Sequence, residues 1–249
     1  MAKQAGLGDR LFVAGYNLSG DIGSLGRIGG GVAGTQDVTG IDKSAFERIG
    51  LARDGSLEFS AFWNVATDRA HLRLSALPTS DQILTYCRGA ALGSHAASLV
   101  GKQINYDPSR AADGSLTIAV QALANAYGLE WGRLLTAGIR TDTSATNGSS
   151  VDFGTGSTAF GLQAYLHVFA FTGTSVTVKL QESSDDGAGD AWADVTGGGF
   201  TAATGVTSQR IETARGQTVE RYLRVVTTGT FSNAQFAVSV TRNDVSTVF

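Results

Sequence analysis

The chain carries the tetrapeptide Asp-Gly-Ser-Leu twice, and this repeat constrains its fold more than any other feature. The copies begin at Asp54 and Asp113, and an alternation of apolar and polar residues follows each of them. Asp-Gly favours a tight turn because glycine accepts positive φ and aspartate accepts hydrogen bonds from nearby backbone amides. The repeat therefore predicts a sheet built from two similar halves, with hairpins around 54–55 and 113–114.

The alternation after each turn assigns side chains to the two faces of the sheet, because successive strand residues point to opposite faces. Glu58 and Ser60 share the polar face of the first strand, and Thr117 and Gln121 share the corresponding face of the second. The apolar faces hold Leu57, Phe59, Ala61 and Trp63 in the first copy, and Leu116, Ile118, Val120 and Ala122 in the second. Residues 70–74 are predicted to extend the first hairpin.

The composition points to assembly. Glycine contributes 33 of 249 residues, about 13% against a usual level of about 7%. Charged residues make up 16%, below the roughly 25% of an average soluble domain. A free monomer normally keeps its surface charged for solubility. A surface with so little charge is better suited to burial against copies of the same chain.

Charge and cysteine content exclude several classes of function. The net charge of −3 supplies no basic footprint for phosphates, which disfavours tight nucleic-acid binding. The single cysteine, Cys87, excludes an internal disulfide and a multi-cysteine zinc site. Residues 1–6 contain no apolar signal core, and no apolar stretch approaches the roughly 20 residues of a membrane-spanning helix. We expect a protein made in a cytoplasm, with no membrane span.

Residues 1–35 are predicted to form an arm and a long loop. Seven glycines lie within 19–35, and each costs a helix up to about 1 kcal/mol relative to alanine. Three apolar residues recur at intervals of three within this segment and have no core of their own. We expect these residues, together with Leu18, to contact a neighbouring subunit; the three are Ile22, Leu25 and Ile28.

One α-helix is predicted, over about residues 79–91. Pro78 precedes it, and Thr79 with Gln82 fits a capping box. A short apolar stripe follows, formed by Ile83, Leu84, Cys87, Ala90 and Ala91. This helix is expected to cover one face of the sheet.

The polar, turn-rich segment 141–156 is the predicted boundary between a domain at 1–156 and a domain at 157–249. The second domain consists of short alternating segments separated by Gly, Asp and Ser turns, which is typical of a β sandwich of Ig-like or jelly-roll type. The predicted fold class is therefore mainly β. It combines a barrel or sandwich carrying one packed α-helix with a C-terminal β sandwich.

The residues that could carry chemistry form no convincing site. Gly29, Gly31 and Gly34 match G-x-G-x-x-G, but the strand and helix that a dinucleotide site requires do not flank them. The histidines, His71, His95 and His167, lie in different elements. No nucleophile elbow, H-E-x-x-H or Walker A motif is present. We expect neither enzymatic activity nor a cofactor.

An acidic cluster and three tryptophans each allow two interpretations. Calcium binding within Asp185–Asp194 stays open, because hard cations prefer carboxylate oxygens. The spacing differs from an EF-hand, however, so we favour a solvated hairpin loop without a metal. For Trp63, Trp131 and Trp192 we favour packing in a core or at a subunit interface over a stacking site for sugars or bases.

Residues 15–25, Gly-Tyr-Asn-Leu-Ser-Gly-Asp-Ile-Gly-Ser-Leu, resemble the N-terminal strand and loop of the major tail tube proteins of long-tailed, non-contractile bacteriophages. Residues 37–60 resemble the next hairpin of that family. The hairpin at 113–116 and the helix predicted between the two copies fit its duplicated half-barrel. The resemblance covers roughly residues 9–140.

The resemblance implies a tail-tube-type β barrel and a structural role in the virion tail. Such proteins form hexameric rings that stack into a tube, helped by an N-terminal arm and a long loop. The tube conducts double-stranded DNA during ejection without binding it specifically. Implied partners are copies of the chain and other tail proteins, namely tape measure, terminator and tip. Assembly would occur in the host cytoplasm, with residues 157–249 as an outer domain.

A conduit should not grip the duplex that it transports, and small polar or acidic side chains let phosphates slide past. The lumen candidates are therefore Glu58, Ser60, Thr117 and Gln121. Arg69, His71 and Arg73 share another face, which is assigned neither to the lumen nor to a subunit contact.

Two other functions share the same sequence features. A capsid decoration or head-fibre protein would also combine a sandwich domain with low charge. A carbohydrate-binding adhesion module would use the aromatic residues of 157–249. A hydrolase ranks last, because no nucleophile and base can be paired from the sequence.

Overall fold

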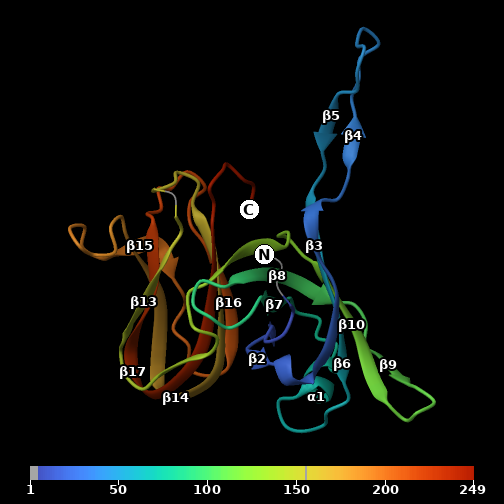
Figure 1. Cartoon of the computed structure of the whole chain (residues 1–249), viewed down its shortest axis with the longest axis horizontal. Coiled ribbons are helices and arrows are strands. Elements are labelled where there is room, and N and C mark those ends of the chain that lie inside the picture. Colours follow the sequence, from blue (N-terminus) through green and yellow to red (C-terminus); the bar gives the residue numbers. More distant parts are fainter. Residues whose placement is uncertain (1–4, 155) are drawn as a thin grey trace.

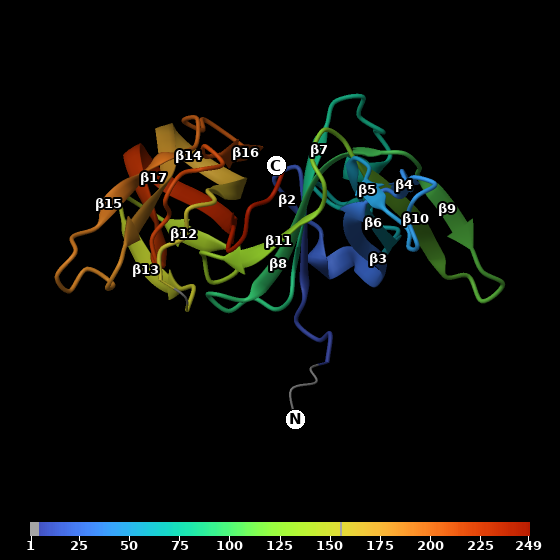
Figure 2. The ribbon, with the colours of Figure 1, turned by 90° about the horizontal axis from the view of Figure 1, so that it is seen from above.

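The computed structural model describes residues 5–154 and 156–249, and antiparallel strands make up most of it (Figure 1). Residues 1–4 of the predicted arm and Thr155 in the predicted boundary lie outside the described residues. The mainly β class is confirmed, and the large antiparallel sheet is consistent with a β sandwich. The described strands do not close into a barrel. Two units lie side by side in both views (Figures 1 and 2).

The first unit contains most of the N-terminal strands. Its main sheet has the order β8-β10-β6-β3, with β3 at the edge, and β7 pairs with both β1 and β8. The elements are β1 (Arg10–Val13), β2 (Tyr16–Asn17), the 3-10 helix η1 (Ser19–Asp21), β3 (Ile22–Val32), β6 (Arg53–Phe62), α1 (Ala70–Leu74), β7 (Gln82–Cys87), β8 (His95–Gln103), β9 (Asp107–Arg110), β10 (Leu116–Ala124) and β11 (Glu130–Leu134).

The predicted faces of the two repeated strands are confirmed except at their ends, where Trp63 lies beyond β6 and is exposed and Leu116 is only half-buried. Strands β6 and β10 pair with each other, with Phe59 opposite Val120 and Glu58 opposite Gln121. The buried face contributes to one core, through Leu57, Phe59, Ala61, Ile118, Val120 and Ala122. The period-2 alternation was sufficient to place these residues.

The second unit is organised by two long strands that pair along almost their whole length. Both halves of β14 and of β17 contribute to a single core, so the two-stranded ribbon is folded over on itself. Gly173 permits the bend: its φ is +151°, and an added Cβ would lie 2.4 Å from Cα of Phe231. The elements are β12 (Arg140–Asp142), β13 (Asn147–Asp152), β14 (Leu162–Ser183), β15 (Ala193–Gly199), β16 (Thr207–Glu212) and β17 (Tyr222–Arg242).

The segment predicted as a domain boundary, 141–156, belongs largely to the second unit. Strands β12 and β13 both pair with β17, and Leu135 and Val151 pack in the core of that unit. The segment is polar because β13 alternates exposed and half-buried positions rather than because it is a linker.

The prediction of an α-helix over residues 79–91 is wrong. Residues 82–87 form β7, which lies between β1 and β8 and is buried on both faces. A strand covered on both sides has a continuous apolar run, which periodicity alone cannot distinguish from a helix. The α-helix is instead α1, at residues 70–74, which we had predicted as strand.

The glycine-rich segment is likewise a strand rather than a flexible loop. Residues 22–32 form β3, which pairs with β6 along its length with two register shifts. The element that leaves the body is the following segment, 33–52, which we call the projecting hairpin. It contains β4 (Thr35–Asp37) and β5 (Arg48–Gly50), which form a separate two-stranded sheet above the first unit (Figure 1).

The two Asp-Gly pairs have different roles. Asp113-Gly114 forms the predicted turn between β9 and β10, with Gly114 at φ +91°. Asp54-Gly55 lies inside β6, so the first predicted hairpin turn is wrong. Glycine is required there by close packing, because a Cβ on Gly55 would lie 2.6 Å from the backbone nitrogen of Leu129.

Replacing Gly55 with alanine should lower the free energy of unfolding by about 1–3 kcal/mol, because the added methyl displaces the Leu129 backbone. Urea unfolding measures the effect. Gly216→Ala is the matched control, since a Cβ there meets no atom within 4 Å, and it should change stability by less than about 0.5 kcal/mol. Equal stability of the two variants would contradict the packing argument.

A buried polar chain joins the two units. Nδ1 of His167 accepts the N–H of Gly15 at 3.2 Å, so Nε2 carries the ring proton and donates to Oγ1 of Thr85 at 2.9 Å. The hydroxyl oxygens of Thr85 and Ser98 are hydrogen-bonded at 3.0 Å, and those of Ser98 and Ser239 at 2.9 Å. Burial lowers the pKa of His167 to about 3, so the ring is neutral. This series of hydrogen bonds connects β7 and β8 to β14 and β17.

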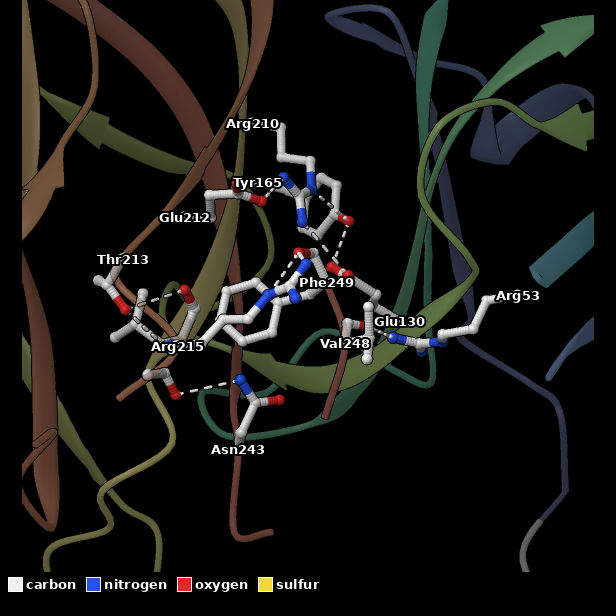
Figure 3. Close-up of polar contacts among 12 residues, drawn as sticks. Arg53, Glu130, Tyr165, Arg210, Glu212, Thr213, Arg215, Asn243, Val248 and Phe249 are labelled. Carbon is white, nitrogen blue, oxygen red and sulfur yellow. Dashed lines mark hydrogen bonds and ion pairs between the residues drawn. The ribbon is translucent and has the colours of Figure 1, made fainter. Parts of the chain in front are cut away.

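A buried ionic cluster fixes the same junction (Figure 3). Tyr165 of β14 donates to Glu130 of β11 at 2.5 Å, and Arg210 of β16 lies 3.3 Å from the other Glu130 oxygen. The Arg210 guanidinium also stacks 3.6 Å from the ring centre of Tyr127. Burial and the neighbouring Glu130 charge raise the pKa of Tyr165 well above its usual value, so it remains a donor.

The segment after β17 also spans both units. Arg53 of β6 donates to the backbone oxygen of Val248 at 2.5 Å, and Arg215 Nε donates to that of Phe249 at 3.1 Å (Figure 3). Together with the polar chain and the ionic cluster, these contacts hold the two units as one body.

The stability of the protein should therefore depend on pH through His167. Its folded pKa is about 3 and its ordinary value is 6.5, so the unfolded chain binds the extra proton as pH falls from about 6.5 towards 3. The stabilisation is present above pH 6.5 and is lost on acidification. His167→Phe should remove this slope and cost about 1–3 kcal/mol at pH 7 through the lost hydrogen bonds.

Urea midpoints measured from pH 7 to pH 4 test this expectation. His95→Phe, on an exposed position of β8, is the control and should retain the wild-type slope. An unchanged slope in His167→Phe would contradict the buried, neutral state of that ring.

Candidate assembly surfaces

The structure brings the four lumen candidates together on one face of the first unit. Gln121 Nε2 donates to Glu58 Oε1 at 3.0 Å across the β6–β10 pair. Ser60 lies opposite Ala119, and Thr117 lies opposite Phe62, on the face away from the core. All four candidates are half-buried. Glu58 is the only charged residue among the four candidates, and the exposed ring of Phe62 adds an apolar side chain to the same face. The orientation of this face towards a lumen stays a prediction.

The four residues expected to contact a neighbouring subunit are already packed in their own chain. Leu18 is completely buried, so its side chain has no surface left for a neighbour. Ile22, Leu25 and Ile28 are half-buried against the core of the first unit. The premise that they lack a core was wrong, because β3 forms part of the sheet. A subunit contact through their remaining exposed surface stays a prediction.

The projecting hairpin carries the apolar surface that the sequence had led us to expect on 19–35. Its exposed apolar side chains are Val38, Ile41, Phe46, Ile49 and Leu51, and Ile41 is as exposed as in an extended peptide. The hairpin is nevertheless ordered internally. Asp37 accepts hydrogen bonds from the Thr39 hydroxyl at 2.5 Å and from the Thr39 N–H at 2.9 Å, and these two bonds lower the pKa of Asp37. The signal for this surface was apolar residues within a charged, turn-rich segment.

A second exposed apolar surface lies at residues 62–77, which we call the α1 patch. It contains Phe62, Trp63, Val65, Leu72 and Leu77. It occupies the end of β6 opposite the projecting hairpin, beside α1 (Figure 1).

Hydrogen bonds and ring stacking hold the residues of the α1 patch in place. The buried Asp21 carboxylate accepts the Asn64 side-chain amide at 2.8 Å and the N–H of Ala70 at 3.0 Å. The ring of Trp63 stacks on His71 at 4.1 Å between centroids, and His71 Nδ1 lies 2.6 Å from the Tyr106 hydroxyl. The patch is therefore a preformed surface and not a mobile loop.

The sheet itself ends in an open edge. Strand β3 pairs only with β6 among the described residues, so its outer backbone groups face away from the sheet. An unpaired edge strand is a template for pairing with another chain.

The acidic cluster forms the loop between β14 and β15, which confirms a hairpin loop. The Asp185 carboxylate accepts backbone N–H groups from Ala188, Gly189 and Asp190, which closes the loop on itself. Within the described residues, no group of three or more His, Cys, Asp or Glu side chains is arranged to hold a metal.

Glu220 lies next to this loop. Its burial, a hydrogen bond with Asp190 and the surrounding acidic charges raise its pKa to about 7. The folded protein therefore keeps a proton that the unfolded chain releases near pH 4.5, and this contribution to stability is lost as pH rises through 7.

Glu220→Gln should abolish that loss. We expect the urea midpoint of the wild type to decline relative to that of the variant between pH 5 and pH 8, by a small amount because the group is partly solvated. Glu47→Gln, at an exposed position of the projecting hairpin, is the control and should retain the wild-type profile. Parallel midpoint profiles for wild type and Glu220→Gln would show that the carboxyl titrates normally.

None of the helices in the described chain is long and apolar enough to cross a membrane. No protein-family model matches the sequence. No curated protein matches it either.

Solved structures give distant matches. The SPP1 Dit (gp 19.1) protein, described as a paradigm of the hub adsorption apparatus of phages that infect Gram-positive bacteria, shares 12% identity over 93% of this chain and 98% of its own, with a TM-score of 0.32. The phage p2 baseplate, activated with Sr, contains a chain that shares 10% identity over 95% of this chain and 99% of its own, with a TM-score of 0.30. The same baseplate activated with Ca gives 10% identity and a TM-score of 0.27. TM-scores in this range do not establish a shared fold.

Proposed function

We propose that this chain is a structural protein of a bacteriophage tail, that it acts without enzymatic activity, and that it assembles with copies of itself into closed rings. The observation that carries the proposal is the projecting hairpin, whose apolar side chains are exposed in the single chain. A lone two-stranded sheet is marginally stable in water. Such an element gains stability when its apolar side chains are covered by another subunit.

The open edge of β3 supplies the second contact. Pairing this edge with an edge strand of the next copy would satisfy its outer backbone groups and would exclude unrelated strands. Strand β9 lies at the opposite edge of the same sheet from β3, and it pairs only with β10 among the described strands. Contact between two different edges is heterologous, and it closes into a ring when the rotation per subunit divides a full turn.

In such a ring, the face carrying Glu58, Ser60, Thr117 and Gln121 would line the lumen. Its hydrogen-bonded Glu58–Gln121 pair offers phosphates no cation to bind. Stacked rings, which we expect to be hexameric, would then form the tail tube that conducts double-stranded DNA during ejection. Tape measure, terminator and tip proteins would be its other partners, in a virion tail assembled in the host cytoplasm. The second unit would lie outside the ring.

The projecting hairpin provides the test. Ile41→Asp combined with Phe46→Ser should prevent assembly, because both replace exposed apolar side chains with polar ones, while the thermal midpoint of the monomer stays within a few degrees of wild type. Light scattering and negative-stain microscopy of purified protein measure assembly. The control is Val206→Asp with Val245→Ser, which makes the same changes at exposed apolar positions elsewhere.

Rings or tubes formed by the wild type and by the control, but not by the hairpin variant, would support the proposal. Monomers or trimers that dock on capsid shells would favour a decoration protein instead. A hairpin variant that assembles like the wild type would overturn the role of the hairpin.

A further inference from the structure

We infer that the projecting hairpin of one copy docks on the α1 patch of a second copy, so that copies associate end to end along the direction of β6. The inference rests on the proposed self-assembly and identifies the surface that receives the hairpin.

Strand β6 places the two surfaces at opposite ends of the first unit. It begins at Arg53, directly after the projecting hairpin, and ends at Phe62, where the α1 patch begins. Its ten residues span about 30 Å at the usual rise per residue. The projecting hairpin and α1 lie at opposite ends of the unit in Figure 1, and in the view from above the hairpin lies over β6 (Figure 2). Repeated translation along this strand brings each hairpin towards the α1 patch of the next copy.

The two surfaces hold most of the exposed large apolar side chains of the described residues, five in each. Both surfaces are apolar, but they differ in how firmly they are held. The projecting hairpin is a thin element that is marginal alone, whereas the α1 patch is held by Asp21 and the Trp63–His71 stack. A preformed site lowers the ordering cost of binding, because only the hairpin loses freedom.

The charges of the two surfaces are complementary. The hairpin carries three acidic and two basic residues, a net charge of −1, and the patch carries two arginines and one aspartate, a net charge of +1. Within the hairpin, Lys43 lies 4.0 Å from Asp42 and 3.4 Å from Glu47. Within the patch, Arg73 is ion-paired, whereas Arg69 has no hydrogen bond or ion pair from its side chain among the described residues. Arg69 is thus placed to meet an acidic residue of the hairpin.

This contact differs from the lateral pairing of β3 and has a different geometric consequence. The hairpin and the α1 patch are different surfaces, so their contact is heterologous and, when repeated by translation, generates an open polymer. It also places Arg69, which the sequence left unassigned, at a subunit contact. Because α1 is a helix and not the predicted strand, Arg69, His71 and Arg73 do not share one strand face. Lateral pairing of β3 would form each ring. The contact between the projecting hairpin and the α1 patch, which we call the axial contact, would stack one ring on the next.

Cysteine cross-linking between two differently marked copies tests the contact. Copies carrying Ile41→Cys are mixed with copies carrying Val65→Cys and are oxidised with copper phenanthroline. The single native cysteine, Cys87, is buried and its pKa is raised to about 12 by burial, so it stays silent. We expect a disulfide-linked dimer from the mixture, at least about ten-fold more abundant than from Ile41→Cys mixed with Val206→Cys, an exposed position of the second unit.

The outcomes separate this inference from the proposed function. If the mixture assembles and the hairpin–patch disulfide does not exceed the control, the axial contact is wrong and self-assembly stands. If Ile41→Cys copies cross-link mainly with one another, the hairpins meet each other and the inference is overturned. If neither wild type nor variants assemble at high concentration, both proposals fall.

A charge exchange gives an independent readout. Arg69→Glu should raise the concentration required for half-assembly by about ten-fold, because it places like charges together at the contact. Asp42→Arg in the same chain should restore assembly towards the wild-type concentration. Lys179→Glu, which reverses a half-buried charge of the second unit that pairs with Asp194, is the control and should not change the concentration required for half-assembly. Failure of Asp42→Arg to rescue Arg69→Glu, together with no cross-link, would refute the contact.

Discussion

One hydrogen-bonded sheet runs through both units, and the other features of the structure depend on it. Its path passes from β3 through β6, β10, β8 and β11 to β17, β14 and β15. A buried backbone group without a partner costs about 1–3 kcal/mol, so a sheet of this length is hard to interrupt between the units. Strand β11 makes the connection, because it pairs with β8 on one side and with β17 on the other. The His167 chain and the Glu130–Arg210 cluster fill the space around that crossing with satisfied polar groups.

A sheet that does not close into a barrel has edge strands, and open backbone groups and exposed apolar side chains of this protein lie at or beside one of them. One end is β3, with an open edge and a glycine-rich sequence, and from it the projecting hairpin rises with its apolar side chains in solvent. The low content of charged residues becomes intelligible in this setting. A surface intended for burial against other copies does not require the charge that keeps a monomer dispersed. The proposed axial and lateral contacts would use different parts of the first unit, which would allow rings to form and to stack independently.

The sequence predicted those parts of the fold that depend on short-range patterns. Period-2 alternation placed Glu58 and Gln121 on the polar face of the two strands, and Phe59 and Val120 on the buried face. The turn at Asp113-Gly114 followed from local turn chemistry. The second unit was predicted as short strands after residue 157, whereas it includes β12 and β13 and is organised by two strands of 22 and 21 residues. Prediction failed where tertiary packing decides. Strand β7 resembles a helix because both its faces are buried, and Gly55 resembles a turn residue although its role is to admit the Leu129 backbone.

The candidate site shows the same division. The four polar residues of the β6–β10 face were correctly grouped, since all of them lie on regular strands. The apolar element that leaves the body was assigned to 19–35 instead of 33–52, because glycine content suggested flexibility and pairing between β3 and β6 is not visible in a local window. The α1 patch was not identified, because its exposed residues are spread over a strand end, a loop and a helix.

The central claim is that the single chain is an incomplete unit whose exposed hairpin and sheet edge are covered by copies of itself. Cryo-electron microscopy of the purified protein at high concentration tests it most directly. The account predicts closed rings or stacked rings in which Glu58 and Gln121 line the inner surface and each projecting hairpin is buried against another copy. Isolated monomers at every concentration, or rings with Glu58 and Gln121 on the outer surface, would contradict it.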